Sequence, residues 1–338
     1  MNAQNRQIRL QSRPEGMPAA GNFKLDNSAR PEVGDGSVLR RTIYLSLDPY
    51  MRGRMSDARS YAASVNLGDV MCGHTVSEVV ESRNPRFKPG TIVAGYDGWQ
   101  DFAVSDGKDI RPIDASLAPI RTALSVLGMP GMTAYVGLLD IAQMKPGDTV
   151  VVSAAAGAVG SIVGQLAKIK GGRAVGVAGS ADKCRYVVNE LGFDACINYK
   201  TEDLVEALKA ACPDGVDVDF ENVGGDVLAA VLRVLKQGAR IALCGLISEY
   251  NATNSTPGPN LRPLLVNRAT IRGFIVSDHQ DRAGAFLHEC TPLVASGRLK
   301  HREDVVQGLE EAPSALIRLF EGRNFGKLIV QVSDDPTL

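Results

Sequence analysis

The stretch VVSAAAGAVGSIVGQLAKIKGGRAVGVAGSADK, residues 151–183, decides the fold of this chain. A short apolar run leads into a turn of small residues, and an amphipathic helical pattern follows at once. Gly157 and Gly160 stand where a backbone must approach a pyrophosphate and where a helix must pack closely on a strand, and Ala155 takes the place of the first glycine of G-x-G-x-x-G. The amides and positive end of the following helix would hold the pyrophosphate. This strand, turn and helix together predict a dinucleotide site rather than a purely structural tight turn.

The end of the second predicted strand indicates which dinucleotide is bound. NAD-binding sheets place an acidic residue about twenty residues after the glycine motif, where it binds the adenosine ribose. Here Gly179 and Ser180 leave room where a carboxylate would repel a 2′-phosphate, and Lys183 and Tyr199 are placed to bind that phosphate. The alternatives are that Lys183 is an ordinary solvated residue and that the nearby Asp182 binds the ribose of NAD. The pattern favours NADP.

The alternation of strand, glycine turn and amphipathic helix continues on both sides of this motif. It predicts an α/β domain with a parallel sheet and helices on both faces, which is the doubly wound Rossmann arrangement. The predicted strands are 148–154, 173–180, 195–199, 216–224, 240–247 and 270–276, and the predicted helices are 161–171, 181–192, 201–211 and 226–238. We expect Thr201 to open the third of these helices and Gly238 to close the fourth.

The pattern before about residue 127 is different. Short apolar runs at 37–47, 71–82, 87–96 and 99–105 are separated by turn residues, which predicts a small, mostly antiparallel barrel or sandwich. The tail carries a helical pattern at 308–322 and a strand pattern at 327–332, and we expect it to return to the first domain. The predicted domains are therefore 1–126, completed by about 305–338, and 127–304.

Composition excludes several other classes of protein. The 37 basic and 38 acidic residues give a formal net charge of −1, and no basic block indicates a nucleic-acid or membrane-surface partner. The first part of the chain lacks the apolar core of a secretory signal, and no apolar run reaches the roughly 18 residues of a membrane span. The six cysteines are scattered without a C-x-x-C pair, which predicts reduced, mostly buried thiols. We expect a cytoplasmic protein.

Further motifs extend along almost the whole chain. They include LDPYMRGRM from Leu47, GMPGMTAY from Gly128, AAAGAVGSIVGQLAKIKG from Ala154, FENVGG from Phe220 and CGLISEYN from Cys244. In these motifs the chain resembles the zinc-independent branch of the medium-chain dehydrogenase/reductase family, which contains leukotriene B4 12-hydroxydehydrogenase, prostaglandin reductases and curcumin-reductase-like enzymes. The resemblance implies a GroES-like β-barrel domain beside the Rossmann domain, NADPH as cofactor, and a homodimer.

The resemblance also implies which residues bind NADP. At the pyrophosphate they are Gly157, Ala158, Val159 and Gly160, and at the 2′-phosphate they are Lys183 and Tyr199, next to Ser180. Around the ribose and the nicotinamide they are Thr133, Asn222, Cys244, Gly245, Leu246, Ile247, Ser248, Tyr250, Phe274, Ile275, Val276 and Asn324.

The histidines give no indication of a metal site. Zinc members of the family often carry a Gly-His-Glu turn, whereas this chain has His74 followed by Thr75. The chain has four histidines, and none has a cysteine or a second histidine at metal-ligand spacing. We therefore predict no metal, and we interpret His74 as a structural residue rather than a ligand.

A conjugated carbon–carbon double bond is an easier hydride acceptor than a simple ketone when no metal polarises the carbonyl. Hydride addition leaves charge on an enolate oxygen, and the candidate hydrogen-bond donors to it are Tyr50 and Tyr250. The alternatives are that Tyr250 only contacts the ribose, that Tyr50 only shapes the pocket, and that water or a ribose hydroxyl supplies the proton. Arg52 and Arg54 either bind a substrate carboxylate or are solvated.

We therefore expect an NADPH-dependent reductase of α,β-unsaturated ketones or aldehydes, with specificity set by loops such as 56–69 and 255–264. A quinone reductase on the same fold and a non-catalytic NADPH-binding sensor are the alternatives.

Overall fold

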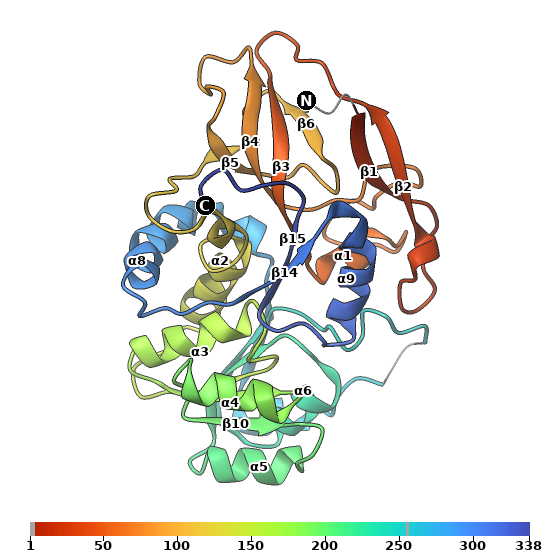
Figure 1. The fold of residues 1–338 in the computed structure, drawn as a ribbon. Helices are drawn as coiled ribbons and strands as arrows, with labels where there is room; N and C mark the ends of the chain where they lie inside the picture. The colour runs from red at the N-terminus through yellow and green to blue at the C-terminus, as the bar shows by residue number, and fades with distance from the viewer. Residues whose placement is uncertain (1–3, 255–256) are drawn as a thin grey trace. The chain divides into compact units, whose positions relative to one another are not determined.

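The computed structural model describes residues 4–254 and 257–338 (Figure 1). The chain forms two compact units. Unit 1 contains the described residues up to Leu124 together with Glu303–Asn324 and Leu328–Leu338, and unit 2 contains Ser125–Arg302 and Phe325–Lys327. Residues 1–3 of the predicted first domain and residues 255–256 of the predicted specificity loop lie outside the described part.

Unit 1 is built on an antiparallel sheet whose central strand is β3. Its strands within the described ranges are β3 (Val38–Ser46), β4 (Thr75–Ser82), β5 (Ile92–Gly95), β6 (Phe102–Ser105), β7 (Arg111–Pro112), β14 (Glu303–Gln307) and β15 (Lys327–Gln331). One edge of β3 pairs with β4, while its other edge pairs first with β6 and then with β15. Strands β6 and β15 therefore occupy successive parts of the same edge of β3. The predicted antiparallel domain is confirmed.

A second, two-stranded sheet lies at the start of unit 1. Strands β1 (Gln4–Leu10) and β2 (Phe23–Ala29) pair antiparallel, and Figure 1 shows them side by side. Their polar sequence did not indicate strands, although Ile8 and Leu10 of β1 are buried. Helices α1 (Tyr50–Arg54) and α9 (Ala312–Phe320) complete the unit.

Unit 2 is a six-stranded parallel sheet with the order β10-β9-β8-β11-β12-β13 in the described residues. The strands are β8 (Thr149–Val152), β9 (Arg173–Ala178), β10 (Ala195–Asn198), β11 (Val216–Glu221), β12 (Leu235–Leu243) and β13 (Thr270–Gly273). The helices are α2 (Met129–Val136), α3 (Gly160–Ile169), α4 (Ala181–Asn189), α5 (Leu204–Ala211), α6 (Gly225–Leu232), α7 (Arg262–Asn267) and α8 (Ala283–Ala295). The predicted doubly wound sheet is confirmed.

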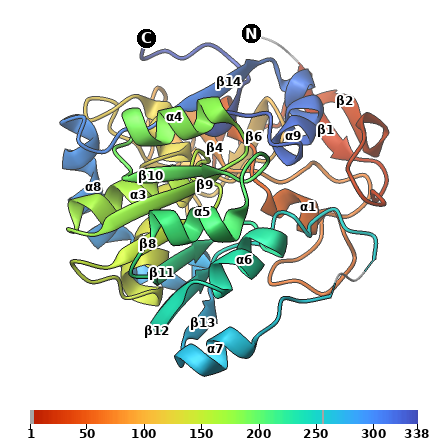
Figure 2. The same ribbon diagram turned by 90° about the horizontal axis from the view of Figure 1, so that it is seen from below.

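Helices lie on both faces of this sheet (Figure 2), and the alternate side chains of β9 pack against them. Val175 and Val177 pack in a buried cluster with Leu208 of α5 and Leu228 of α6. Gly176, between them, faces the opposite way, and a β-carbon placed on it would lie 3.0 Å from Val187 of α4. Both faces of the strand are therefore buried, as its apolar sequence predicts.

Two predicted helix boundaries are wrong. Helix α5 begins at Leu204 rather than at Thr201, because the Asp203 carboxylate caps it by accepting the backbone N–H groups of Val205 at 3.0 Å and Glu206 at 3.1 Å.

Helix α6 ends at Leu232 instead of Gly238. The residues from Leu235 onward belong to the sheet instead, since Leu235 pairs with Val216 and starts β12. Gly238 lies within that strand with a φ of 77°, beside a shift in register. None of the helices in the described ranges has the length and apolar character needed to cross a membrane.

Candidate functional site

The glycine turn between β8 and α3 is shaped by close backbone contacts. A β-carbon on Gly160 would stand 2.5 Å from the carbonyl oxygen of Ala154, which itself has a φ of 50°. The Gly157 N–H donates to the same carbonyl at 2.8 Å. The turn therefore brings the start of α3 against the end of β8, with Ala158 and Val159 half-buried between the glycines. The first N–H groups of a helix have no carbonyl partner in the helix, so this end is suited to a pyrophosphate.

The residues predicted for the 2′-phosphate lie together at the carboxyl ends of β9 and β10. The Tyr199 N–H donates to Ala178 at 3.1 Å, and the Tyr199 ring covers Gly179, whose added β-carbon would lie 3.0 Å from that ring. Ser180 caps α4 by accepting the Lys183 N–H at 3.3 Å, so Lys183 stands on the first turn of that helix.

Asp182, which was the alternative candidate for binding the ribose of NAD, interacts with another residue. Its carboxylate is paired with Arg185 on the exposed side of α4. This arrangement favours a phosphate over a bare ribose at the adenosine end.

Asn222 follows β11 and is anchored on both sides. Its backbone N–H donates to the Ser153 hydroxyl oxygen at 2.7 Å, and its side-chain amide donates to the Ser153 carbonyl at 2.8 Å. The Ser153 hydroxyl donates in turn to the Glu221 carboxylate at 2.6 Å. The amide oxygen of Asn222 is thereby oriented by a network that joins the ends of β8 and β11.

The segment after β12 forms a loop closed by Tyr250. The Gly245 N–H donates to the Glu221 carbonyl at 3.1 Å, and the Ile247 N–H donates to the Asn222 carbonyl at 3.1 Å. The Tyr250 hydroxyl oxygen lies 3.5 Å from the Leu246 amide nitrogen and would be 3.1 Å from a β-carbon on Gly245. Burial raises the pKa of Tyr250, so its phenol remains protonated. Cys244 and Ser248 belong to the same loop.

The remaining predicted residues of unit 2 lie on other elements. The Thr133 hydroxyl donates to the Met129 carbonyl within α2 at 2.8 Å. Phe274 packs edge-to-face on Phe220 at a centroid distance of 6.3 Å, and Ile275 and Val276 follow it, half-buried.

The predicted residues of unit 2 that follow β8 to β13 gather at one edge of the sheet. Since parallel strands bring their carboxyl ends to the same edge, the turn at 157–160, the ends of β9 and β10, Asn222, the loop 244–250 and Phe274 share it. Tyr50 and Asn324 belong to unit 1, where Asn324 is buried.

Unit 1 contains a cluster of polar aromatic side chains around Tyr50. The Tyr50 hydroxyl oxygen lies 3.5 Å from Nδ1 of His74 and 3.5 Å from the hydroxyl oxygen of Tyr96. The Arg54 guanidinium donates to the Tyr96 hydroxyl at 3.1 Å. Burial, and then the nearby charge of Asp48, raise the pKa of Tyr50 well above its ordinary range. The sequence did not indicate Tyr96, because only the pairing of β4 and β5 brings it beside His74.

Neither interpretation of Arg52 from the sequence is right. Its side chain is buried, and it donates to the carbonyls of Pro14 at 3.2 Å and Gly16 at 3.1 Å. Arg52 therefore holds the N-terminal segment in place, and neither binds a substrate carboxylate nor faces solvent.

Two buried carboxyl groups on β11 were also missed. Asp219 and Glu221 are both fully buried, and neither carboxyl oxygen of Asp219 has a hydrogen-bond partner among the described residues. Burial raises the pKa of each group, and the charge of Glu221 raises that of Asp219 further. Glu221 accepts hydrogen bonds from Ser153, Val223 and Gly224, so Asp219 is the group that keeps its proton.

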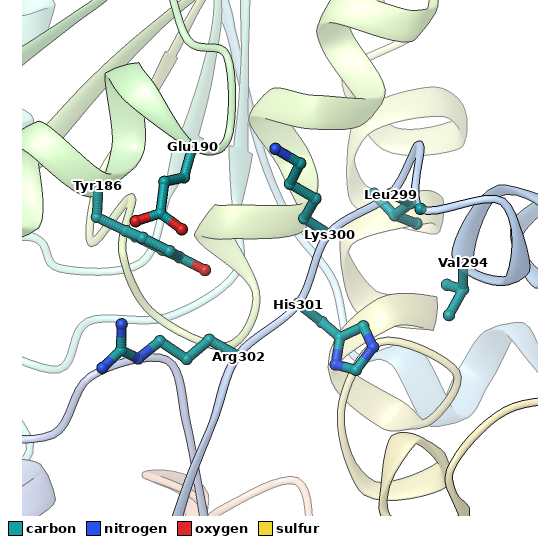
Figure 3. A pocket seen from close by; sticks show the side chains of 8 residues that line it. Tyr186, Glu190, Val294, Leu299, Lys300, His301 and Arg302 are labelled. Atoms are coloured by element: carbon teal, nitrogen blue, oxygen red, sulfur yellow. The ribbon is translucent and has the colours of Figure 1, made fainter.

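A hollow of about 430 Å³ lies elsewhere in unit 2 (Figure 3). Tyr186 and Glu190 line one side of it, and the segment from Leu299 to Arg302 lines another. The Arg302 guanidinium stands over the Tyr186 ring at 5.7 Å. None of the predicted NADP-binding residues lines this hollow, so it is separate from the carboxyl edge of the sheet.

Comparison with known proteins identifies the family. The chain matches the N-terminal domain of oxidoreductase family over residues 6–113 and the zinc-binding dehydrogenase family over residues 158–290. It is 49% identical over 337 residues to the NADPH-dependent curcumin reductase of Escherichia coli (strain K12), with 98% of each chain covered. The chain belongs to the medium-chain dehydrogenase/reductase family. The resemblance carried by the sequence motifs is confirmed.

Two further medium-chain dehydrogenase/reductase relatives extend the comparison. The NADP(+)-dependent 2-alkenal reductase of Nicotiana tabacum is 42% identical over 335 residues, which cover 97% of this chain and 98% of that protein. The crystal structure of CurA from Vibrio vulnificus in complex with NADPH is 50% identical, with a TM-score of 0.93 and coverage of 98% of this chain and 100% of that one.

Proposed function

We propose that this protein is an NADPH-dependent reductase of the carbon–carbon double bond in α,β-unsaturated ketones and aldehydes. The observation that carries the proposal is chain-long similarity to NADPH-dependent curcumin reductase and to a 2-alkenal reductase. The gathering of the expected NADP-binding residues at one edge of the unit 2 sheet supports it.

The residues of unit 2 fit NADPH on the geometry of three glycine positions. Gly157 and Gly160 leave the backbone at the start of α3 open to a pyrophosphate, and Gly179 leaves space under the Tyr199 ring beside Lys183. Asn222 and the loop 244–250 are placed for the ribose and the nicotinamide. When bound, NADPH supplies a hydride.

The tyrosines are the candidate hydrogen-bond donors to the substrate in the proposed reaction. Hydride arriving at the β-carbon leaves negative charge on the enolate oxygen of the substrate. Burial raises the pKa of both Tyr50 and Tyr250, so each phenol remains neutral, and each is a separate candidate for the hydrogen-bond donor to such an oxygen. Neutral donors stabilise the enolate without first having to be desolvated as charges.

The proposed reaction is independent of zinc. The described residues contain no group of three or more His, Cys, Asp or Glu side chains placed to hold a metal ion. His74 instead lies among Tyr50 and Tyr96, with a centroid distance of 4.8 Å to the Tyr96 ring. Activity is therefore expected to survive a chelator.

We further propose a homodimer formed through the β13 edge of the sheet. In the described strands β13 pairs only with β12, and all four of its residues are exposed. Leu261, Leu265 and Val266 beside it are 59%, 79% and 57% exposed. An open strand edge flanked by apolar side chains suits pairing with a second copy of the same edge.

The proposed location is the cytoplasm. All six cysteines carry free thiols, as is usual in a reducing compartment. The near balance of 37 basic and 38 acidic residues supports the absence of a nucleic-acid or membrane partner.

The test is the loss of NADPH absorbance with a panel of enones, a quinone and a simple ketone, repeated with NADH and with a chelator. We expect enone turnover that the chelator does not change and that is much faster with NADPH than with NADH. Turnover of the quinone alone would contradict the substrate class. NADPH binding without any turnover would instead identify a sensor.

A further inference from the structure

We propose that His74 supplies the proton that Tyr50 delivers to the reduced substrate, and that Arg54 and Tyr96 hold Tyr50 ready for this transfer. The inference rests on the proposed function and assigns the source of its proton. It is carried by the arrangement of four side chains within unit 1, two from α1 and two from one end of the β4–β5 pair.

Tyr50 is a poor acid by itself. Its hydroxyl group is held by burial and by the charge of Asp48 in the neutral form. A proton lost to the substrate would leave a buried phenolate, and that charge needs hydrogen-bond donors within reach. Nδ1 of His74 and the Tyr96 hydroxyl oxygen each lie 3.5 Å from the Tyr50 hydroxyl oxygen. Such distances are long for ground-state hydrogen bonds and are expected to shorten once the substrate is bound.

Arg54 determines in which direction the Tyr96 hydroxyl group can donate a hydrogen bond. A guanidinium group only donates, so the Tyr96 oxygen accepts the Arg54 hydrogen bond at 3.1 Å. The Tyr96 hydrogen is then free to be directed at another acceptor. Its neighbours are the Tyr50 oxygen and the thiol of Cys72, and sulfur is the weaker acceptor. While Tyr50 is neutral, its hydroxyl donates to the Tyr96 oxygen. A Tyr50 phenolate can only accept, so Tyr96 is a positioning residue that donates to Tyr50 once the phenolate forms.

His74 completes the transfer because it is the group of this cluster that ordinarily exchanges protons near neutral pH. The Tyr50 O–H bond breaks and its proton forms the C–H bond at the α-carbon of the enolate. The Nδ1–H bond of imidazolium His74 then breaks, its proton restores the Tyr50 hydroxyl, and His74 regains a proton from water. The charged and titratable groups around this path are Asp48 and Arg54 of the α1 region, Cys72 before β4, and Tyr96 after β5.

The test compares His74→Gln with the wild type across pH, using NADPH and the best enone. Glutamine keeps a hydrogen-bond donor but cannot exchange a proton. We expect kcat of the wild type to fall as pH rises through the titration of His74, because only the imidazolium form supplies the proton. His74→Gln should lower kcat about a hundredfold at the acid end, remove this dependence on pH, and leave KM for NADPH unchanged. The exposed His288→Gln is the matched control and should keep the wild-type profile.

A second measurement needs neither cofactor nor turnover. Proton NMR follows the titration of His74, whose resonance is assigned as the one missing in His74→Gln. Replacing Tyr50 by Phe removes an acceptor of the imidazolium, so the pKa of His74 should fall by about half a unit in Tyr50→Phe. An unchanged His74 titration in Tyr50→Phe, or a wild-type pH profile in His74→Gln, would overturn the inference. If the wild type reduces no enone at any pH, the proposed function fails instead.

Discussion

The ring of Tyr199 lies over Gly179, so closely that a β-carbon on the glycine would stand 3.0 Å from a ring carbon. The two residues follow adjacent parallel strands, and Lys183 stands one helical turn beyond them. This corner of unit 2 therefore combines an aromatic ring, a hydroxyl group and the first turn of α4, while Asp182 pairs with Arg185. Hydrogen-bond donors and a lysine suit a 2′-phosphate.

The first prediction concerns that phosphate. Lys183→Ala removes the proposed cation, and a charge-assisted hydrogen bond contributes about 1.5–3 kcal/mol. The Kd for NADPH should therefore rise about ten- to a hundredfold, while the Kd for NADH stays the same. Fluorescence titration of both nucleotides measures this, with Lys209→Ala on α5 as the control. An equal loss for NADH would show that Lys183 stabilises the fold and does not bind the phosphate.

The glycine turn gives a second prediction. Gly160→Ala places a methyl group 2.5 Å from the Ala154 carbonyl, so α3 has to move away from β8. Such overpacking costs about 1–3 kcal/mol of the free energy of unfolding. We expect a lower Tm together with weaker NADPH binding. In contrast, Gly284→Ala on α8 meets nothing within 4 Å and should leave both measurements unchanged; a tolerated Gly160→Ala would contradict the close contact.

Asp219 predicts an unusual dependence of stability on pH. Its pKa is raised in the folded protein, so the folded state keeps a proton that the unfolded chain releases above about pH 4. The stabilisation from this group is complete below that pH and is lost as pH rises toward the raised pKa. Asp219→Asn removes the loss. As pH rises through this window, the free energy of unfolding of Asp219→Asn should therefore increase relative to that of the wild type by about 1 kcal/mol per pH unit.

Urea unfolding at several pH values, with the exposed Asp214→Asn as the control, measures the Asp219 effect. A difference between Asp219→Asn and the wild type that is the same at pH 4 and pH 7 would mean that Asp219 ionises normally.

The open edge of the sheet gives a fourth prediction. Leu265→Asp puts a charge on a side chain that is 79% exposed in the single chain and that the proposed dimer would bury. The charge should dissociate the dimer without lowering the stability of the fold, because the side chain packs little within its own unit. Light scattering after size exclusion measures the mass. Leu117→Asp, at a position in unit 1 that is 53% exposed, should remain dimeric, and a wild type that is already monomeric would refute the proposed assembly.

Features that depend on neighbouring residues could be predicted from the sequence, and those that depend on distant contacts could not. The turn around Gly157 and the apolar strands of unit 2 are encoded locally, so they were recognisable before the structure. The boundary at Gly238 was not, because the pairing of Leu235 with Val216 converts a helical pattern into a strand. Strand β1 was hidden for a similar reason, since its polar Asn5 and Gln7 are buried beside Ile8, where they donate to the Phe102 carbonyl and the Gln100 side chain from a distant part of the chain.

The same distinction holds for the candidate site. The motifs indicated Tyr50 and Tyr250, but a single histidine and a single tyrosine at His74 and Tyr96 carry no pattern of their own. They become a cluster with Tyr50 only when β4 and β5 pair. The unusual state of Asp219 could not be predicted either, because the amino-acid sequence of β11 does not show that its carboxyl oxygens lack hydrogen-bond partners among the described residues.

The return of the tail to unit 1 affects how the chain matures on the ribosome. Strand β15, which fills one edge of β3, is synthesised only after all of residues 125–302. The segment of unit 2 before Arg302 can therefore collapse during translation. Until β15 is synthesised, part of the edge of β3 stays unpaired. Exposed strand edges are prone to aggregation. A nascent chain arrested before residue 327 should for this reason depend on chaperones more than a chain that has already released β15.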